Sequence, residues 1–168
     1  SVSALLSGAL LNIAFLAILR CYQICSAAGL SQFTDTLLIL FGLASLFIAV
    51  VFITNQKDYK RLLAYSSVEH MGILSLGMGI GAPFASLLHM VNHSLTKGLL
   101  FLVAGHIVLG YRTKKVSEVQ GVLKTLPITG ILFVMGSMAI MGLPPFALFI
   151  SKFLILQESL SHNHPVVA

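Results

Sequence analysis

Five long apolar runs constrain the fold of this chain more than any other feature of its sequence. Hydrophobic residues make up 57% of the chain and charged residues only 9%, whereas soluble domains carry ~25% charged residues. At ~1.5 Å rise per residue, such runs cross a bilayer core of ~30 Å as helices. They are too long for the strands of a closed barrel and do not alternate. We therefore predict an all-α, polytopic transmembrane helix bundle. The predicted spans are residues 2–19, 36–54, 62–81, 84–110 and 127–156.

The basic residues predict the orientation of these spans. The loops at residues 55–61 and 111–126 fall on one side of the membrane and carry seven of the ten basic residues, whereas the opposite side carries only Arg20. The positive-inside rule places the basic loops in the cytoplasm. The net charge of +5 is thus a topology signal and not the footprint of a nucleic-acid-binding protein.

One predicted span carries ionisable residues at its centre. His89, His93 and Lys97 follow one another at four-residue steps, so they form a single stripe along a helix. A charge at this depth costs ~2.5–3.5 kcal/mol on insertion scales and usually serves ion or proton passage. We predict a proton path through these three residues. A lysine that extends to the interface and a metal site at the two histidines are the alternatives.

Glu69 and His70 permit two interpretations. Ser66 and Glu69 match a capping box, which would begin a helix at this point. A helix from Ser67 to Gly81 would, however, be only ~22 Å long, which is short for a bilayer. If the helix begins near residue 62, Glu69 is a buried carboxylate that needs a cation, and His70 or Lys97 could supply it. Both residues are therefore candidates for the proton path.

The last span is interrupted by a proline pair. Pro144 and Pro145 follow Gly142, and because proline lacks the helix donor and clashes with the preceding turn, we predict a broken helix at residues 142–145. Broken helices in membranes mark ion sites. Lys152 stands two turns beyond the break, so we predict a role in proton transfer, with an interfacial anchor as the alternative.

The remaining polar residues predict no cofactor. Cys21 and Cys25 are packed thiols or half of a metal site that has no further ligand nearby in the sequence. The chain has no Cys-x2-Cys pair and no glycine-rich phosphate loop, so we expect this segment to hold no iron–sulfur cluster or nucleotide by itself. Asn12, the strongly polar residue of the first span, is expected to hydrogen-bond to another helix.

Three motifs in this order resemble a known superfamily. It comprises the antiporter-like membrane subunits of respiratory complex I, of Mrp-type sodium/proton antiporters and of energy-converting hydrogenases. The Glu-His pair is most similar to the branch of hydrogenase-4 component F and formate hydrogenlyase. The motifs are Asp58-Tyr-Lys-Arg-Leu-Leu-Ala-Tyr-Ser-Ser-Val-Glu-His-Met-Gly72, His89-x3-His93-x3-Lys97-Gly-Leu-Leu-Phe-Leu-x-Ala-Gly105 and Gly142-Leu-Pro-Pro-Phe-x4-Ser-Lys152.

The resemblance implies a proton-translocating, non-catalytic subunit of a redox-driven complex of the hydrogenase-4 or NADH:quinone oxidoreductase type. Lys97 looks like the central lysine, His89 and His93 like its companions, and Lys152 like the terminal lysine. The alternatives are an Mrp-type cation/proton antiporter subunit without a redox partner and a structural membrane scaffold. Asn12 stands where many members place a lysine, so the proton must reach Lys97 by another route or through water.

The resemblance also implies what surrounds the chain. Residues 1–168 look like the C-terminal part of the antiporter-like module, because the family's upstream glutamate–lysine pair would precede Ser1. The expected partners are other membrane subunits, a peripheral redox arm with iron–sulfur subunits and the lipid bilayer, but not nucleic acid. The expected location is the inner (plasma) membrane of a prokaryote, as a multi-pass protein.

Overall fold

The chain folds into a bundle of helices, as predicted. The computed structural model describes residues 2–161, and no strand occurs within them. A π-helical turn, Leu6–Leu10, joins the first two helices into one rod, and a 3-10 turn, Val116–Glu118, lies in the loop before α6. The helices are α1 (Val2–Leu5), α2 (Leu11–Ala27), α3 (Ser31–Thr54), α4 (Tyr59–Gly79), α5 (Pro83–Tyr111), α6 (Val122–Thr125), α7 (Pro127–Met141) and α8 (Ala147–Ser161).

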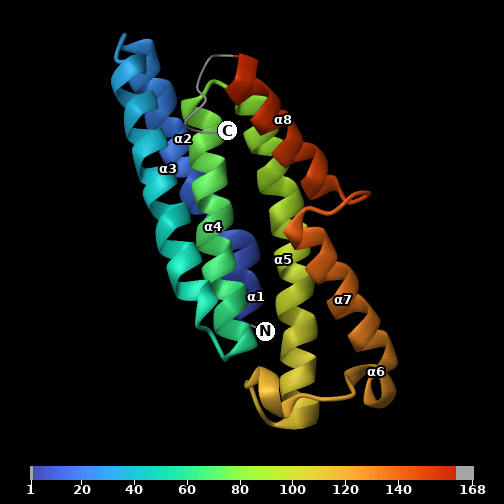
Figure 1. Ribbon diagram of the computed structural model, residues 1–168. Coiled ribbons are helices and arrows are strands. Elements are labelled where there is room, and N and C mark those ends of the chain that lie inside the picture. The colour runs from blue at the N-terminus through green and yellow to red at the C-terminus, as the bar shows by residue number, and fades with distance from the viewer. Residues whose placement is uncertain (1, 162–168) are drawn as a thin grey trace.

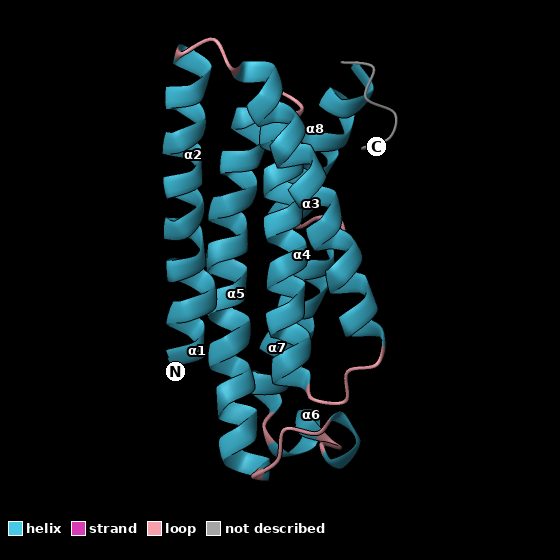
Figure 2. Cartoon of the chain, turned by 90° about the vertical axis from the view of Figure 1, so that its left-hand side faces the viewer, coloured by secondary structure: helices cyan, strands magenta, loops and turns pink. Residues whose placement is uncertain are grey.

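Helix α5 is the axis of the bundle. Figure 1 shows α2, α3 and α4 on one side of it and the α7–α8 pair on the other. Turned by 90°, Figure 2 shows the α1–α2 rod running beside α5. Proline at the first position begins both α5 and α7, where the missing amide hydrogen costs nothing. Helices α1, α4, α7 and α8 and the π-helical turn all pack against α5, which carries the predicted stripe.

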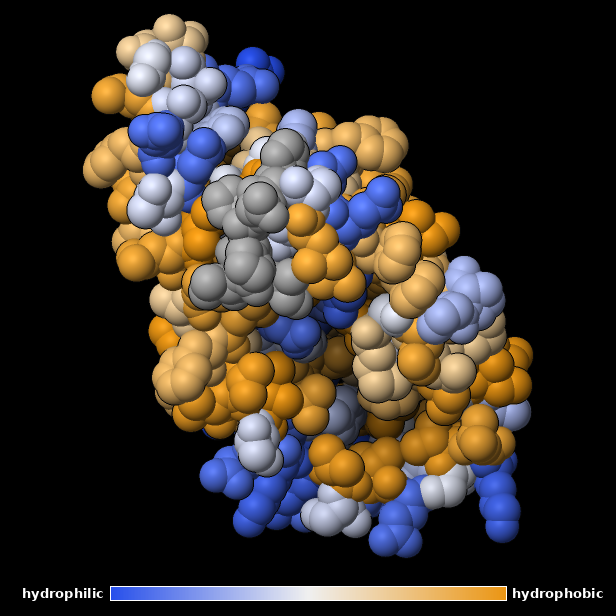
Figure 3. Space-filling model, turned by 45° about the horizontal axis from the view of Figure 1, so that its top comes forward, coloured by the Kyte–Doolittle hydropathy of each residue, from blue (hydrophilic) through white to orange (hydrophobic). Residues whose placement is uncertain are grey.

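Within residues 2–161, three helices are long and apolar enough to cross a membrane: residues 2–27, 31–54 and 83–111. Apolar side chains cover most of the face seen in Figure 3, as expected of a surface in contact with lipid or other apolar helices. Helix α4 has 21 residues but is more polar, and α7 and α8 have 15 residues each. The spans predicted for α4 and for the α7–α8 pair therefore stay predictions. Predicted bounds differ most at α2, which continues past Leu19 to Ala27.

The predicted break in the last helix is present at residues 142–146. Gly142 adopts φ +79°, and it ends α7 by donating its amide hydrogen to the Ala139 carbonyl, while Leu143 donates to the Met138 carbonyl. This pair of hydrogen bonds is a Schellman cap, which favours glycine because its left-handed conformation strains other residues. The chain then resumes as α8 along the upper part of α5 (Figure 1).

The two basic loops meet at one end of the bundle. The Tyr59 amide donates to the Lys114 carbonyl over 3.2 Å, and the Val116 amide donates to the Lys57 carbonyl over 3.0 Å. These bonds form an isolated antiparallel bridge between Asp58 and Lys115. The charge asymmetry read from the sequence is therefore an asymmetry of the folded chain.

Helices α3 and α4 approach closely at a pair of glycines. A Cβ atom built on Gly72 would lie 2.9 Å from the Gly42 carbonyl oxygen, and one built on Gly42 would lie 3.0 Å from the Gly72 carbonyl oxygen. Backbone oxygens cannot move aside as a flexible side chain can. Small residues are needed at both positions for this approach.

We expect Gly72→Ala to loosen this contact. The added methyl group meets backbone, so the helices must separate, at a cost of ~1–3 kcal/mol. The measurement is the thermal unfolding of the purified full-length protein in detergent. Gly98→Ala is the matched control, because a Cβ atom there has no neighbour within 4 Å. Equal melting temperatures for the two variants would contradict the role of Gly72.

Candidate functional site

The three residues of the predicted stripe on α5 are completely buried. His89, His93 and Lys97 each have 0% of their surface exposed. Lys97 is the middle residue of the Pro83–Tyr111 helix, about 21 Å along the axis from either end at ~1.5 Å per residue. The predicted stripe therefore exists, and the position of its lysine excludes the alternative of an interfacial side chain.

Helix α4 supplies both hydrogen-bond partners of the Lys97 amine. Its Nζ donates to the Leu63 carbonyl oxygen over 2.7 Å and to the Ser66 hydroxyl over 2.5 Å. A buried ammonium needs such partners, because the low dielectric provides no water to replace them. Both bonds use N–H donors, and a neutral amine keeps two of these. The same two contacts can therefore serve Lys97 before and after it loses a proton.

These partners depend on where α4 begins. Asp58 is the N-cap: its carboxylate accepts the amide hydrogens of Lys60 over 2.9 Å and Arg61 over 3.2 Å. The capping-box interpretation of Ser66 and Glu69 was wrong, because both lie in the second and third turns of α4. An aspartate before the periodic run is the signal that identifies the true start.

Two histidines and a serine form a hydrogen-bonded chain across three helices. The His70 Nδ1 atom on α4 lies 2.9 Å from the His89 Nε2 atom on α5. The His89 Nδ1 atom lies 2.9 Å from the hydroxyl of Ser151 on α8, which donates to the Leu148 carbonyl over 3.0 Å. All three side chains are at most 1% exposed. The break before α8 thus places Ser151 beside the predicted site.

His93 lies between Lys97 and this chain but makes no hydrogen bond. Neither of its buried ring nitrogens has a partner among the described residues. Its ring centroid is 5.0 Å from that of His70, at 37° between the ring planes. A buried polar group without a partner is costly, which keeps His93 among the candidate site residues.

A central cavity of about 510 Å³ adjoins this cluster. Glu69 and His70 line it from α4, and Lys152 lines it from α8. Ser66, whose hydroxyl accepts from the Lys97 amine, also lines this cavity. Glu69 forms no ion pair within residues 2–161, although a partner cation was expected. It lines the same cavity as Lys152.

Lys152 is half-buried beside the helix break. Its Nζ atom lies 3.4 Å from the Met141 carbonyl oxygen in the last turn of α7. The carboxyl end of a helix attracts a cation. A Cβ atom on Gly142 would lie 3.1 Å from the Lys152 Cδ atom, so this glycine also leaves room for the lysine. Lys152 therefore faces the central cavity, not the end of the span.

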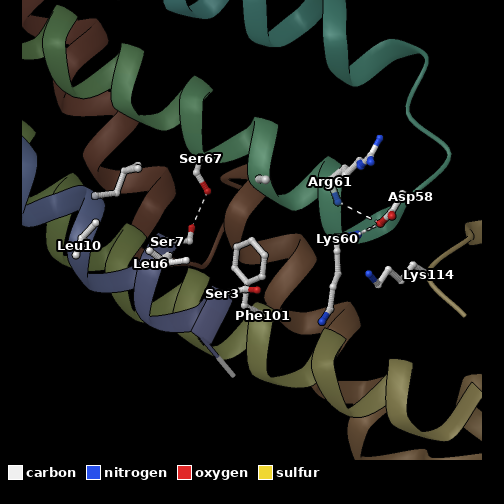
Figure 4. A pocket seen from close by; sticks show the side chains of 12 residues that line it. Ser3, Leu6, Ser7, Leu10, Asp58, Lys60, Arg61, Ser67, Phe101 and Lys114 are labelled. Atoms are coloured by element: carbon white, nitrogen blue, oxygen red, sulfur yellow. Dashed lines mark hydrogen bonds between the residues drawn. The ribbon is translucent and has the colours of Figure 1, made fainter. Parts of the chain in front are cut away.

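A second cavity, also of about 510 Å³, opens between α1, α4 and α5 at the end with the basic loops. Figure 4 shows Asp58, Lys60 and Lys114 around one part of it, and Ser7 and Ser67 facing each other at another. The two serine hydroxyls lie 2.7 Å apart. We call this space the access cavity. From Asp58 to Ser67 it follows α4 for about 14 Å.

The access cavity and the central cavity approach Lys97 from two directions. The Ser67 hydroxyl, in the access cavity, donates over 3.1 Å to the same Leu63 carbonyl that binds Lys97. Ser66, the other partner of Lys97, lines the central cavity. Lys97 itself is completely buried, and its hydrogen-bond partners on α4 connect it to both spaces.

Asn12 does not form the interhelical hydrogen bond that we expected. Its amide nitrogen donates over 2.8 Å to the Gly8 carbonyl of its own helix, and its buried carbonyl oxygen has no partner among the described residues. The Gly8 carbonyl also accepts from Ser94 on α5. The π-helical turn at Leu6–Leu10 presents this carbonyl to both donors, so Ser94 makes the link between helices.

The site contains hydroxyl and backbone groups that sequence reasoning missed. They are Ser66, Ser67, Ser151 and the Leu63 carbonyl. Serines are common on membrane helices, and only the presence of Ser66 and Ser67 next to Glu69 gave a signal. Within residues 2–161 no cluster of three His, Cys, Asp or Glu side chains is arranged to hold a metal ion.

Sequence comparison identifies relatives of the whole chain. The family described as "NADH:quinone oxidoreductase/Mrp antiporter, TM" matches residues 1–168. A hydrogenase-4 component F homolog from Methylacidiphilum infernorum (isolate V4) is 44% identical over 170 residues, which cover 99% of this chain and 36% of that protein. The chloroplastic NAD(P)H-quinone oxidoreductase subunit 5 of Manihot esculenta is 38% identical over 136 residues, which cover 76% of this chain and 18% of that protein. The chain thus spans a minor part of these relatives.

Solved membrane complexes contain the same helix arrangement. A chain of the Mrp complex from Dietzia sp. DQ12-45-1b superposes with a TM-score of 0.87 at 25% identity, over 98% of this chain and 31% of that one. A chain of the membrane-bound sulfane sulfur reductase, an archaeal respiratory membrane complex, superposes with a TM-score of 0.69 at 28% identity. That match covers 74% of this chain and 26% of the other.

The unequal bonding of the two α5 histidines predicts unequal effects on stability. His89→Leu leaves His70 and Ser151 without their partner, so we expect a loss of ~1–3 kcal/mol for each buried group left unpaired. His93→Leu removes a buried group that has no partner, so the melting temperature should stay the same or rise. Thermal unfolding of the full-length protein measures both. Equal losses would show that His93 has a polar partner.

Proposed function

Since the chain belongs to the NADH:quinone oxidoreductase/Mrp antiporter transmembrane family, we propose that it forms the proton-conducting part of an antiporter-like membrane subunit. The proposed path comprises Lys97, Lys152, His89, His93, Glu69 and His70. Within this path, protons move between titratable side chains held inside the membrane, and the chain itself catalyses no redox step.

One observation carries the proposal: the buried Lys97 amine donates to two α4 groups that connect it to both cavities, and a neutral amine has enough donors for both bonds. A lysine that served only packing would gain nothing from this arrangement, because its burial is costly. In many family members a lysine at the position of Asn12 could carry protons toward the central lysine. Here the hydroxyls of the access cavity take that place. The central cavity is large enough for water to connect Ser66, Glu69 and Lys152.

Electrostatic coupling gives the path its mechanism. Glu69 provides the carboxylate of the central cavity, which Lys152 also lines and to which Ser66 connects Lys97. When both lysines are protonated, one carboxylate cannot neutralise both, and like charges repel strongly where screening is weak. A proton that arrives at Lys97 therefore favours release from Lys152. The histidines of α4 and α5 provide intermediate sites between them.

We infer a redox-driven complex as the setting of this subunit. The relative with 44% identity is named as a hydrogenase-4 component F homolog, which supports a hydrogenase-type complex with a peripheral iron–sulfur arm and further membrane subunits. An Mrp-type antiporter complex is the second candidate, because a chain of such a complex superposes over 98% of this one. In both cases we expect no cofactor in this chain, a prokaryotic plasma membrane and basic loops in the cytoplasm.

Replacement of Lys97 by arginine tests the proposed function. Arginine keeps the positive charge but cannot release a proton in proteins, so we expect an assembled complex whose proton flux falls by about 10²-fold, the contribution typical of a proton-transferring group. The measurement is proton uptake into vesicles that contain the full complex. Lys124→Arg, at an exposed position of the short helix α6, is the matched control. Normal flux in Lys97→Arg would refute the proposal.

Replacement of Ser67 by valine tests the access cavity. Valine has nearly the same shape as threonine but no hydroxyl, so it breaks the bond to Ser7 and makes the inner end of the cavity apolar. We expect flux to fall by about tenfold, since water no longer reaches the Lys97 contacts. Ser67→Thr is the control, because it adds the same bulk and keeps the hydroxyl. Equal flux in both variants would exclude this route.

A further inference from the structure

Ser151 is buried beside the histidine pair but does not titrate, and nothing in the proposed path uses it. Its hydroxyl has a single hydrogen, and this hydrogen has two possible acceptors. One is the Leu148 carbonyl at 3.0 Å, and the other is the His89 Nδ1 atom at 2.9 Å. A carbonyl oxygen can only accept, whereas an imidazole nitrogen can either donate or accept. Both contacts are satisfied together only if Ser151 donates to Leu148 and accepts from His89.

This direction fixes the hydrogens of both histidines. With Nδ1–H donated to Ser151, neutral His89 carries its lone pair on Nε2. That atom lies 2.9 Å from the His70 Nδ1 atom, so His70 must donate its own Nδ1–H there. The His70 lone pair is then on Nε2, which makes no hydrogen bond within the described residues. His70 is also the histidine that lines the central cavity.

We propose that Ser151 is a positioning residue that orients the His70–His89 pair, so that His70 Nε2 accepts protons from the central cavity. A proton binds His70 Nε2, the His70 Nδ1–H bond breaks, and its proton forms a new bond to His89 Nε2. His70 is then neutral with hydrogen on Nε2, and His89 is an imidazolium with hydrogen on both nitrogens. One proton has entered, and one positive charge rests on His89.

The serine also serves the product of this step. The Nδ1–H of the imidazolium still donates to the Ser151 hydroxyl, and a hydrogen bond to the charged form stabilises it. The Leu148 carbonyl cannot pass a proton on, because it already accepts the serine hydrogen. The charge on His89 can therefore return only through His70, which makes the pair a reversible store beside the cavity that holds Glu69 and Lys152.

The location of Ser151 explains why the hydroxyl keeps this direction. A serine in a helix readily donates to the carbonyl three or four residues earlier. The break at residues 142–146 begins α8 at Ala147, so Leu148 and Ser151 both lie in the first turns of that helix. With Ser151 0% exposed, bulk water does not compete for the bond.

Nitrogen-15 NMR of histidine-labelled full-length protein in its membrane complex tests this role. Neutral histidine with hydrogen on Nδ1 differs in its ¹⁵N shifts from neutral histidine with hydrogen on Nε2, and the His89 signals are those lost in His89→Gln. We expect the Nδ1–H form in the wild type. In Ser151→Ala the ratio of the two forms should shift by about fivefold toward Nε2–H, the typical net effect of one hydrogen bond. Ser151→Thr should restore it.

Ser86→Ala is the matched control, because Ser86 is also fully buried but its hydroxyl has no hydrogen-bond partner among the described residues. It should leave the tautomer ratio and the flux unchanged. Proton flux should fall in Ser151→Ala and recover in Ser151→Thr. Wild-type His89 in the Nε2–H form, an unchanged ratio in Ser151→Ala, or a shifted ratio with normal flux would each overturn the proposal.

The role of Ser151 in proton transfer rests on the proposed function, but the two can fail separately. If the chain conducts no protons, Lys97→Arg keeps normal flux while the tautomer ratio still responds to Ser151. If Ser151 does not orient the histidines, the ratio is insensitive to it while Lys97→Arg still blocks flux. Should Ser151→Ala fail to assemble, the tautomer of wild-type His89 decides alone.

Discussion

The amine of Lys97 imposes the main constraint on this structure. It sits at the middle of the longest helix, where lipid and apolar side chains provide nothing to replace water. Helix α4 meets the requirement with a backbone carbonyl and a serine hydroxyl. The Leu63 carbonyl also accepts the Ser67 hydroxyl, so the amine shares this acceptor with groups of α4 itself. This geometry holds α4 against α5 in one register, and the helices behind α4 pack accordingly.

The broken helix places further polar groups near the bundle centre, on the opposite side of α5. A continuous helix presents its polar side chains along one face, with no free backbone groups in the middle of the membrane. By ending at Gly142 and resuming at Ala147, the chain exposes the carboxyl end of α7 to Lys152 and places Ser151 at the start of α8. A cation and a hydroxyl thus lie near the bundle centre without a further span.

Much of this arrangement could be predicted from sequence, because the decisive signals are local. Apolar length gave the helices, four-residue spacing gave the buried stripe of α5, and the proline pair gave the break. The start of α4 could also be predicted, because Asp58 is a favourable N-cap residue directly before this helix. The capping-box pattern of Ser66 and Glu69 indicated a different start. Contacts between helices were not predictable: which serine faces Lys97 depends on the rotation of α4, and Ser151 reaches His89 from 62 residues away.

The two cavities differ in the kind of side chain that lines them on either side of Lys97. Between the basic loops and Lys97, the inner end of the access cavity is lined by the hydroxyls of Ser7 and Ser67, which can donate and accept hydrogen bonds but do not titrate. Beyond Lys97 the central cavity adds a carboxylate, a histidine and a second lysine, all of which can store protons. Asn12 fits this division, because a titratable group there would add a storage site before Lys97. On the proposed path, Lys97 is then the first completely buried side chain that can store a proton entering from the basic end, and its charge acts on the sites beyond it.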